Sequence, residues 1–76
     1  MNKDRRKAIE EIIAVIEEQK ERIEALAEEE QESFDNLPEG LQQSEKGSRM
    51  EECAGYLEEA ESSLDEVISN LQKTLY

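Results

Sequence analysis

Apolar residues recur at spacings of three, four and seven positions along most of the chain. With Ile9 taken as heptad position a, the first such stretch runs from Ala8 to about Phe34 and contains neither Gly nor Pro. Its apolar residues occupy positions a, d and e, which is typical of an amphipathic helix. The stretch is rich in Ala, Glu, Ile and Leu, and its overall helix propensity is favourable. The pattern therefore predicts a helix over about 4–34.

A second heptad pattern is more regular than the first. Its position a holds Met50, Leu57, Leu64 and Leu71. Ser48-Arg-Met-Glu51 matches the capping box Ser-x-x-Glu, in which the two side chains satisfy free backbone N–H groups at a helix start. The pattern predicts a helix over about 48–75, with Ser44 as the alternative start.

Between the two patterns, residues 35–47 break the helical periodicity. This segment holds the only proline, Pro38, and two of the three glycines. Asn36-Leu-Pro-Glu39 matches a cap followed by Pro in a first helical turn, so we expect one short turn of helix here. The segment would fold the chain back on itself. We therefore expect an all-α fold in which residues 1–76 form one antiparallel two-helix hairpin.

The apolar face of each predicted helix is too wide for one neighbour to cover. If the chain folds back at residues 35–47, Ile16 lies level with Ile68 and Phe34 with Met50. A pair of helices leaves one edge of each face exposed, and such stripes usually mark association surfaces. We therefore expect a homodimer in which two hairpins form a four-helix bundle. The expected core and dimer stripe is Ile9, Ile12, Ile13, Ile16, Ile23, Leu26, Phe34, Met50, Leu57, Leu64, Val67, Ile68, Leu71 and Leu75.

The N-terminal segment is the one basic part of the chain. Residues 1–7 contain four of the nine basic side chains and a single acid, Asp4, which is the expected helix cap. Cations at a helix N-terminus oppose the helix dipole, although the C-terminal turn of an adjacent antiparallel helix would offset part of that cost. The alternative is a short basic arm that grips a partner.

The charge balance restricts the classes of partner. The chain has 21 acidic and 9 basic residues and a net charge of −12. This charge argues against direct binding to nucleic acid or to anionic membranes, and favours a protein partner with a basic surface. No apolar run approaches the ~18 residues of a membrane span. A single cysteine gives no internal disulfide, so a cytoplasmic location is expected.

Residues suited to catalysis or to metal binding are scarce. The sequence has no histidine, no glycine-rich phosphate loop and no paired cysteines. Cys53 falls at position d, where we expect a small buried apolar side chain and not a nucleophile. We therefore expect no enzyme activity, no catalytic residues, no cofactor and no metal.

Four polar residues lie on the apolar stripe: Gln19, Lys20, Glu30 and Glu61. A polar layer of this kind can set the alignment of the helices or the number of partners. A cage of carboxylates around a metal ion is the alternative, and the absence of His and of clustered Asp weighs against it.

The acidic residues follow the heptads. Two acids tend to come directly after the residue at position a, so each helix carries a double row of carboxylates that repeats every ~10.5 Å. Such rows are usually a solvated outer face. Lys or Arg four residues after an acid is scarce here, so the alternative is a surface that imitates nucleic-acid phosphates for a basic partner. The expected contact residues are Glu10, Glu11, Glu17, Glu18, Glu51, Glu52, Glu58, Glu59, Asp65 and Glu66.

The run from Phe34 to Gly47, followed by Met50-Glu-Glu, resembles the bend of small acidic helical proteins encoded by phages and prophages of Gram-positive bacteria. That family has no assigned catalytic residues. The resemblance implies a phage gene context, and so an inhibitor of a host nucleic-acid-handling or defence protein, of the anti-CRISPR or anti-restriction type.

Two other functions stay open at this point. In the first, the protein is a structural or assembly module, and the apolar stripe is its working surface. In the second, the bend itself recognises the partner through Leu37, Leu41 and Gln42.

Overall fold

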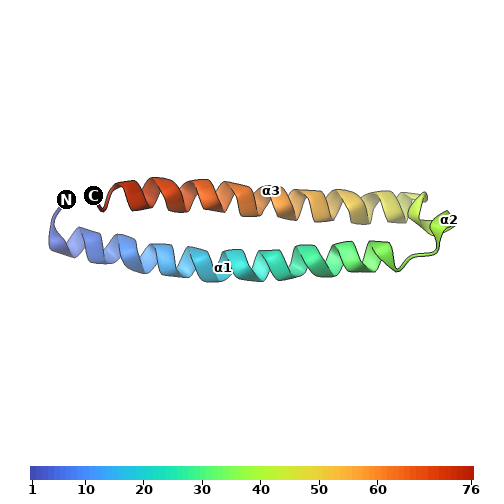
Figure 1. Ribbon diagram of the computed structural model, residues 1–76, viewed down its shortest axis with the longest axis horizontal. Coiled ribbons are helices and arrows are strands. Elements are labelled where there is room, and N and C mark those ends of the chain that lie inside the picture. Colours follow the sequence, from blue (N-terminus) through green and yellow to red (C-terminus); the bar gives the residue numbers. More distant parts are fainter.

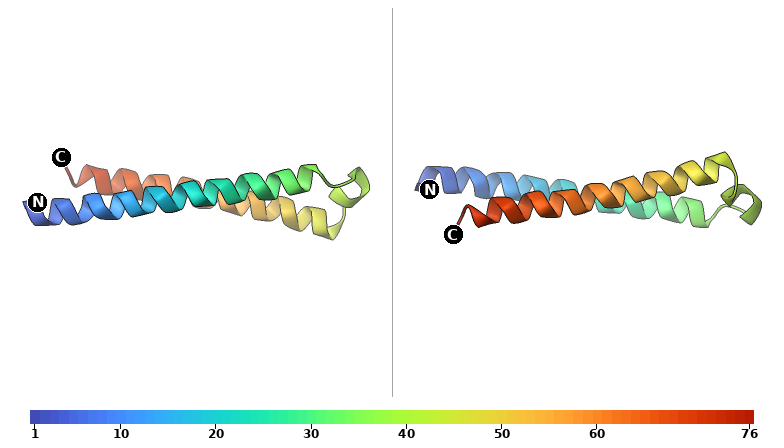
Figure 2. Two further views of the ribbon diagram at one scale, coloured as in Figure 1. Left: turned by 90° about the horizontal axis from the view of Figure 1, so that it is seen from below. Right: turned by 90° about the horizontal axis from the view of Figure 1, so that it is seen from above.

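The computed structural model describes the whole chain, Met1–Tyr76, as three helices and no strands. They are α1 (Lys3–Asp35), α2 (Glu39–Gln42) and α3 (Glu45–Lys73). α1 and α3 lie side by side and run in opposite directions, and the bend that contains α2 joins them (Figure 1). Figure 2 shows that the two long helices cross at a shallow angle. The molecule is a rod whose Cα extents are 58 × 15 × 13 Å. The three helices confirm an all-α fold with two long packed helices.

Both long helices begin at side-chain caps other than the ones expected. The Asn2 side chain accepts a hydrogen bond of 2.8 Å from the Arg5 backbone N–H, so Asn2 and not Asp4 caps α1. Ser44 caps α3 by accepting from the Gly47 N–H at 3.3 Å. α3 therefore starts three residues before the expected Ser48. Ser44 prevails because its backbone is extended and its hydroxyl is within reach of a free N–H of the first turn.

The bend closes the end of α1 with its own side chains. Gln42 donates from Nε2 to the backbone carbonyls of Phe34 (3.2 Å) and Asp35 (3.3 Å). These carbonyls lie in the last turn of α1, where no helical N–H is left to bond them. The Phe34 carbonyl also accepts from the Leu37 N–H of the bend at 3.0 Å. Leu37 is half-buried, whereas Leu41 is 50% exposed. The amide of Gln42, one of the residues expected for recognition by the bend, thus has a structural role.

Gly47 lies close against the backbone of the bend. The residue is buried, and a Cβ added to it would lie 2.5 Å from the carbonyl oxygen of Leu41 and would also overlap the backbone of Gln42. A side chain at this position would force the first turn of α3 away from α2. The absence of a Cβ therefore allows the tight bend.

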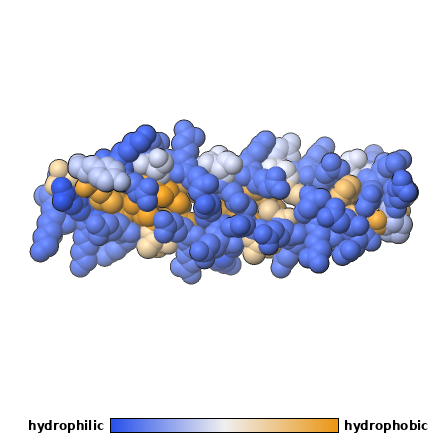
Figure 3. Space-filling model, viewed as in Figure 1, coloured by the Kyte–Doolittle hydropathy of each residue, from blue (hydrophilic) through white to orange (hydrophobic).

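The two long helices meet along heptad positions a and e. The buried apolar residues are Ile13, Ala27, Ala54 and Ile68, all at position e. The half-buried members of the expected stripe are Ile9, Ile16, Ile23, Phe34, Met50, Leu57, Leu64, Leu71 and Leu75. On the face shown in Figure 3, apolar side chains form a narrow band along the seam, bordered by hydrophilic ones.

Three residues of the expected stripe lie outside this contact. Ile12, Leu26 and Val67 are 48%, 53% and 42% exposed. All three occupy position d, which points roughly 80° away from the direction of an a/e contact. A pair of helices can bury two adjacent columns of the stripe but not the third. The large apolar side chains at position d are therefore not part of the core of a single hairpin.

Candidate functional site: an acidic side and an apolar side

The a/e contact divides the hairpin into two sides. Because α1 and α3 are antiparallel and pack through the same heptad positions, the b positions of both helices come to one side. The groove beside the seam is consistent with this arrangement, since it is lined by Glu24 and Gln31 of α1 and by Glu58 of α3, all at position b. Positions d and g of both helices then lie on the opposite side. We call the side with the b positions, with the c positions at its outer edge, the acidic side. We call the side with the d and g positions the apolar side.

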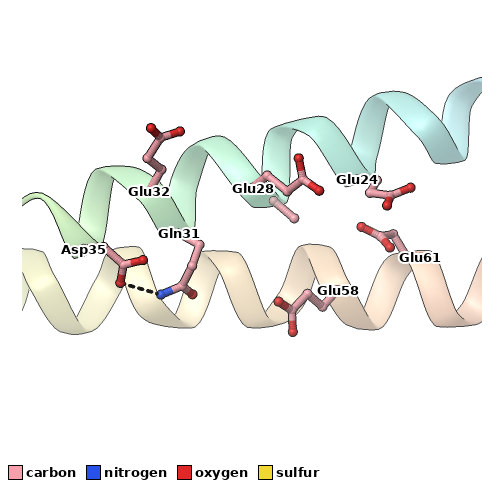
Figure 4. A pocket seen from close by; sticks show the side chains of 8 residues that line it. Glu24, Glu28, Gln31, Glu32, Asp35, Glu58 and Glu61 are labelled. Carbon is pink, nitrogen blue, oxygen red and sulfur yellow. Dashed lines mark hydrogen bonds between the residues drawn. The ribbon is translucent and has the colours of Figure 1, made fainter.

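A shallow groove on the acidic side gathers carboxylates from both helices. Glu24 of α1 and Glu61 of α3 point toward one another across the seam (Figure 4). Gln31 donates from its amide to Asp35 at 3.0 Å. Ala27 is the one apolar residue that lines the groove. The acids that line it are Glu24, Glu28, Glu32, Asp35, Glu58 and Glu61.

Burial and the like charges of this groove change the titration of Glu61. Partial burial against α1 and then the nearby Glu24 carboxylate raise the pKa of Glu61 above its usual value, and Lys20 opposes them. Lys20 forms an ion pair with Asp65 that joins the two helices. The hydrogen bond to Asp65 is the largest reason why the pKa of Lys20 is raised. The expected polar layer at Lys20 and Glu61 therefore extends to Asp65 and Glu24.

We expect mild acid to stabilise the fold. A raised carboxyl pKa means that the folded state binds more protons than the unfolded chain just above the usual glutamate pKa of ~4.3, so stability falls as pH rises through that window. The Tm should be higher at a pH of about 5 than at about 7. The stabilisation that goes with the raised pKa of Lys20 is present at both of these pH values and is lost only at alkaline pH, as the amine deprotonates.

Glu61→Gln should reduce the difference in Tm between the two pH values. Glu59→Gln removes the same charge from an exposed position outside the groove and is the matched control. An equal pH dependence in the two variants, measured by circular dichroism, would assign the effect to net charge and not to the groove.

All ten residues of the expected acidic rows are exposed. Only Glu58 among them lines the groove. Glu61 was expected only as part of the polar layer. The expected acidic rows did not include Glu24, Glu28, Glu32 or Asp35, because none of them belongs to a pair of acids that directly follows a residue at position a. Two signals could have found them. Glu24, Glu28 and Glu32 are spaced four apart on one helix face, and the small Ala27 lies between them on the contact face of α1.

The apolar side carries large exposed apolar side chains and almost no acid. Val15 and Tyr56, both at position g, are 57% and 61% exposed. They add to the exposed d residues Ile12, Leu26 and Val67. Glu29 is the only acid at positions d and g of the two long helices. In a chain with a net charge of −12, acids are thus concentrated away from this side.

Other chemically interesting positions add little. Cys53 is a half-buried free thiol at the edge of the apolar side, more exposed than the buried position expected for it. No group of three or more His, Cys, Asp or Glu side chains has an arrangement that could hold a metal ion. None of the helices contains a segment both long and apolar enough to cross a membrane.

The division of the surface into an acidic and an apolar side is the main basis for a functional proposal, because comparisons with known proteins found no relative. No protein-family model matches the chain, and neither the curated proteins nor the solved structures gave a significant match.

Proposed function

We propose that the protein acts without catalysis, by presenting its acidic side to a basic surface of another protein. The observation that supports this proposal is the segregation of charge. Carboxylates follow the b and c positions of both long helices, whereas the d and g positions contain a single acid, Glu29. Acids that served only for solubility would be expected on every exposed side of the hairpin.

The partner class follows from the spacing of the carboxylates. Acids that repeat every heptad on a rigid rod present negative charge at intervals of ~10.5 Å. A basic groove that binds nucleic acid attracts such a rod over a long range, and association is fast and sensitive to salt. The favoured target is therefore a nucleic-acid-handling or defence protein of a bacterial host. The resemblance of the bend to those of phage-encoded acidic proteins supports the same target class.

The proposed working form is a homodimer, a four-helix bundle in which a second copy covers the apolar side. This arrangement would remove Ile12, Leu26 and Val67 from water. It would also leave the acidic sides of both copies facing outward, away from one another. Self-association through the apolar side and partner binding through the acidic side are then compatible in one particle.

Charge reversal tests the acidic side. We expect the wild-type protein to release bound proteins of a Gram-positive bacterial lysate from DNA-cellulose, and the release to weaken between about 50 and about 200 mM salt. A variant with Glu17, Glu18, Glu58 and Glu59 changed to Lys should release none of them, and the four Glu→Gln changes should have an intermediate effect. All four positions are exposed, so helix content should not change. Release of the same proteins by the Lys variant would reject the proposal.

A second function is favoured by a different observation. The exposed apolar residues at positions d and g are also what a structural or assembly module requires, with the acids serving only for solubility. Such a module would keep its oligomeric state and its biological activity when the four glutamates are reversed. The same variant therefore separates the two functions.

A further inference from the structure

We infer that the second copy lies antiparallel on the apolar side, with α3 against α3 and α1 against α1 of its partner. This inference rests on the dimer proposed above and specifies its geometry. Three features of the hairpin lead to it: a core too small to stand alone, a face of sufficient area, and opposite charges at the two ends of the rod.

The core of one hairpin is small for its length. Five of 76 residues are buried, and no large side chain is less than 2% exposed. Domains of this size are marginally stable even with a normal core. A second hairpin on the apolar side would supply the missing burial. A second copy brings a matching set of exposed apolar residues and, like the first, almost no acid at positions d and g.

The area of the apolar side is sufficient for a specific interface. The Cα extents of 58 and 15 Å give this side a projected footprint of roughly 900 Å², which is large enough to hold an interface of standard size, where each partner buries ~800 Å². Repulsion between two copies would be small there, because Glu29 is the only acid at positions d and g.

The two ends of the rod carry opposite charge. The end with the chain termini holds Lys3, Arg5, Arg6 and Lys7, whereas acids outnumber cations at the bend end, where Lys46 and Arg49 are the only basic residues. A parallel pair would place like ends together. An antiparallel pair places the basic end of each copy beside the acidic bend end of the other, which complementary charge favours.

The exposed side chains match in the antiparallel arrangement. We place a two-fold axis perpendicular to the long axis of the rod, at the level of Ser63. The position d residues of α3 in one copy then face the position d residues of α3 in the second copy, which run in the opposite direction. Ala60 then faces Val67 of the second copy, and Cys53 faces Thr74 of that copy. On α1, Val15 faces Leu26 of the second copy, whereas Ile12 lies near Glu29 of that copy, one helical turn from the same Leu26. Val15, Leu26 and Val67 thus meet apolar groups, and polar residues lie at the centre.

Oxidative cross-linking tests this geometry. Cys53 and position 74 lie on one helix about 31 Å apart, so they cannot form a disulfide within one chain. We expect Thr74→Cys, with native Cys53 retained, to give a covalent dimer on a non-reducing gel. Ser33→Cys lies level with Cys53 on the apolar side, so in a parallel pair it would lie against Cys53 of the second copy. The control variant carries Ser69→Cys together with Cys53→Ala. Its only thiol is exposed at the outer position f, so its yield of covalent dimer measures random collision.

The outcomes distinguish the geometry from the dimer itself. A covalent dimer from Thr74→Cys well above the Ser69 control supports the antiparallel pair. Ser33→Cys counts only where it gives a dimer, because its thiol also lies beside Cys53 of the same chain. Linkage through Ser33→Cys instead overturns the orientation and leaves the dimer intact. If no variant exceeds the collision control and the uncross-linked protein has the mass of one chain, both the geometry and the proposed dimer are wrong.

Discussion

Gly47→Ala is expected to destabilise the protein by about 1–3 kcal/mol, the usual cost of forcing an extra carbon into a packed site. The new Cβ would overlap backbone atoms of Leu41 and Gln42, which cannot move aside as a flexible side chain can. The first turn of α3 or the whole of α2 must shift. The Ser44 cap and the bonds from Gln42 to the end of α1 depend on the same turn. A chain of this size loses about 4–8 °C in Tm for each kcal/mol.

Gly55→Ala is the matched control for this prediction. Gly55 lies on the outer face of α3, and an added Cβ would meet nothing within 4 Å. Because Ala is a better helix former than Gly by about 1 kcal/mol, this variant should be more stable than the wild type. The two Gly→Ala changes should thus have opposite signs in thermal melts at equal protein concentration. A rise in Tm for Gly47→Ala would contradict the close approach of α3 to the bend.

Replacing both Ile12 and Leu26 with Asp should convert the proposed dimer into a monomer and lower the Tm. Each of these side chains is about half exposed in a single hairpin, so their substitution costs that hairpin little. In the proposed dimer each would be buried, a contribution of about 1.5–3 kcal/mol per large apolar side chain. Each copy loses the burial free energy of two large apolar side chains and gains two buried charges. We expect this combined loss to exceed the free energy that holds a marginal interface together. Light scattering measures the mass, and circular dichroism measures the Tm.

Ala14→Asp with Ala25→Asp provides the matched control for that pair. Both alanines are exposed on α1 at positions f and c, away from the apolar side, and the two changes add the same charge. This variant should stay dimeric, with a small loss of stability from charge alone. Equal effects of the two double variants would show that Ile12 and Leu26 have no special place in an interface.

The helices could be predicted from the sequence because the seven-residue spacing is strong and only residues 35–47 break it. The exact helix starts could not, since two serines, Ser44 and Ser48, both precede helical sequence. Gly47 decides between them, because its N–H is free to bond Ser44 and its missing side chain allows the tight turn. That contact arises between elements and leaves no local pattern in the sequence.

The division of the surface was only partly predictable. Heptads with apolar residues at a, d and e do not reveal which two columns a single neighbour covers, so the exposure of Ile12, Leu26 and Val67 required the three-dimensional structure. The acidic groove depends on the alignment of α1 and α3. Glu24 and Glu61 are far apart in the sequence, and only the antiparallel packing beside the Lys20–Asp65 pair brings them together.

The mass of the protein in solution tests the central claim, that charge segregation leaves one side of the hairpin for a second copy. At micromolar concentration and near-physiological salt, light scattering should give twice the 8.8 kDa of one chain. The Tm should also rise with protein concentration, as mass action requires of a dimer. A mass of 8.8 kDa, with a cooperative melt that does not depend on concentration, would contradict the account.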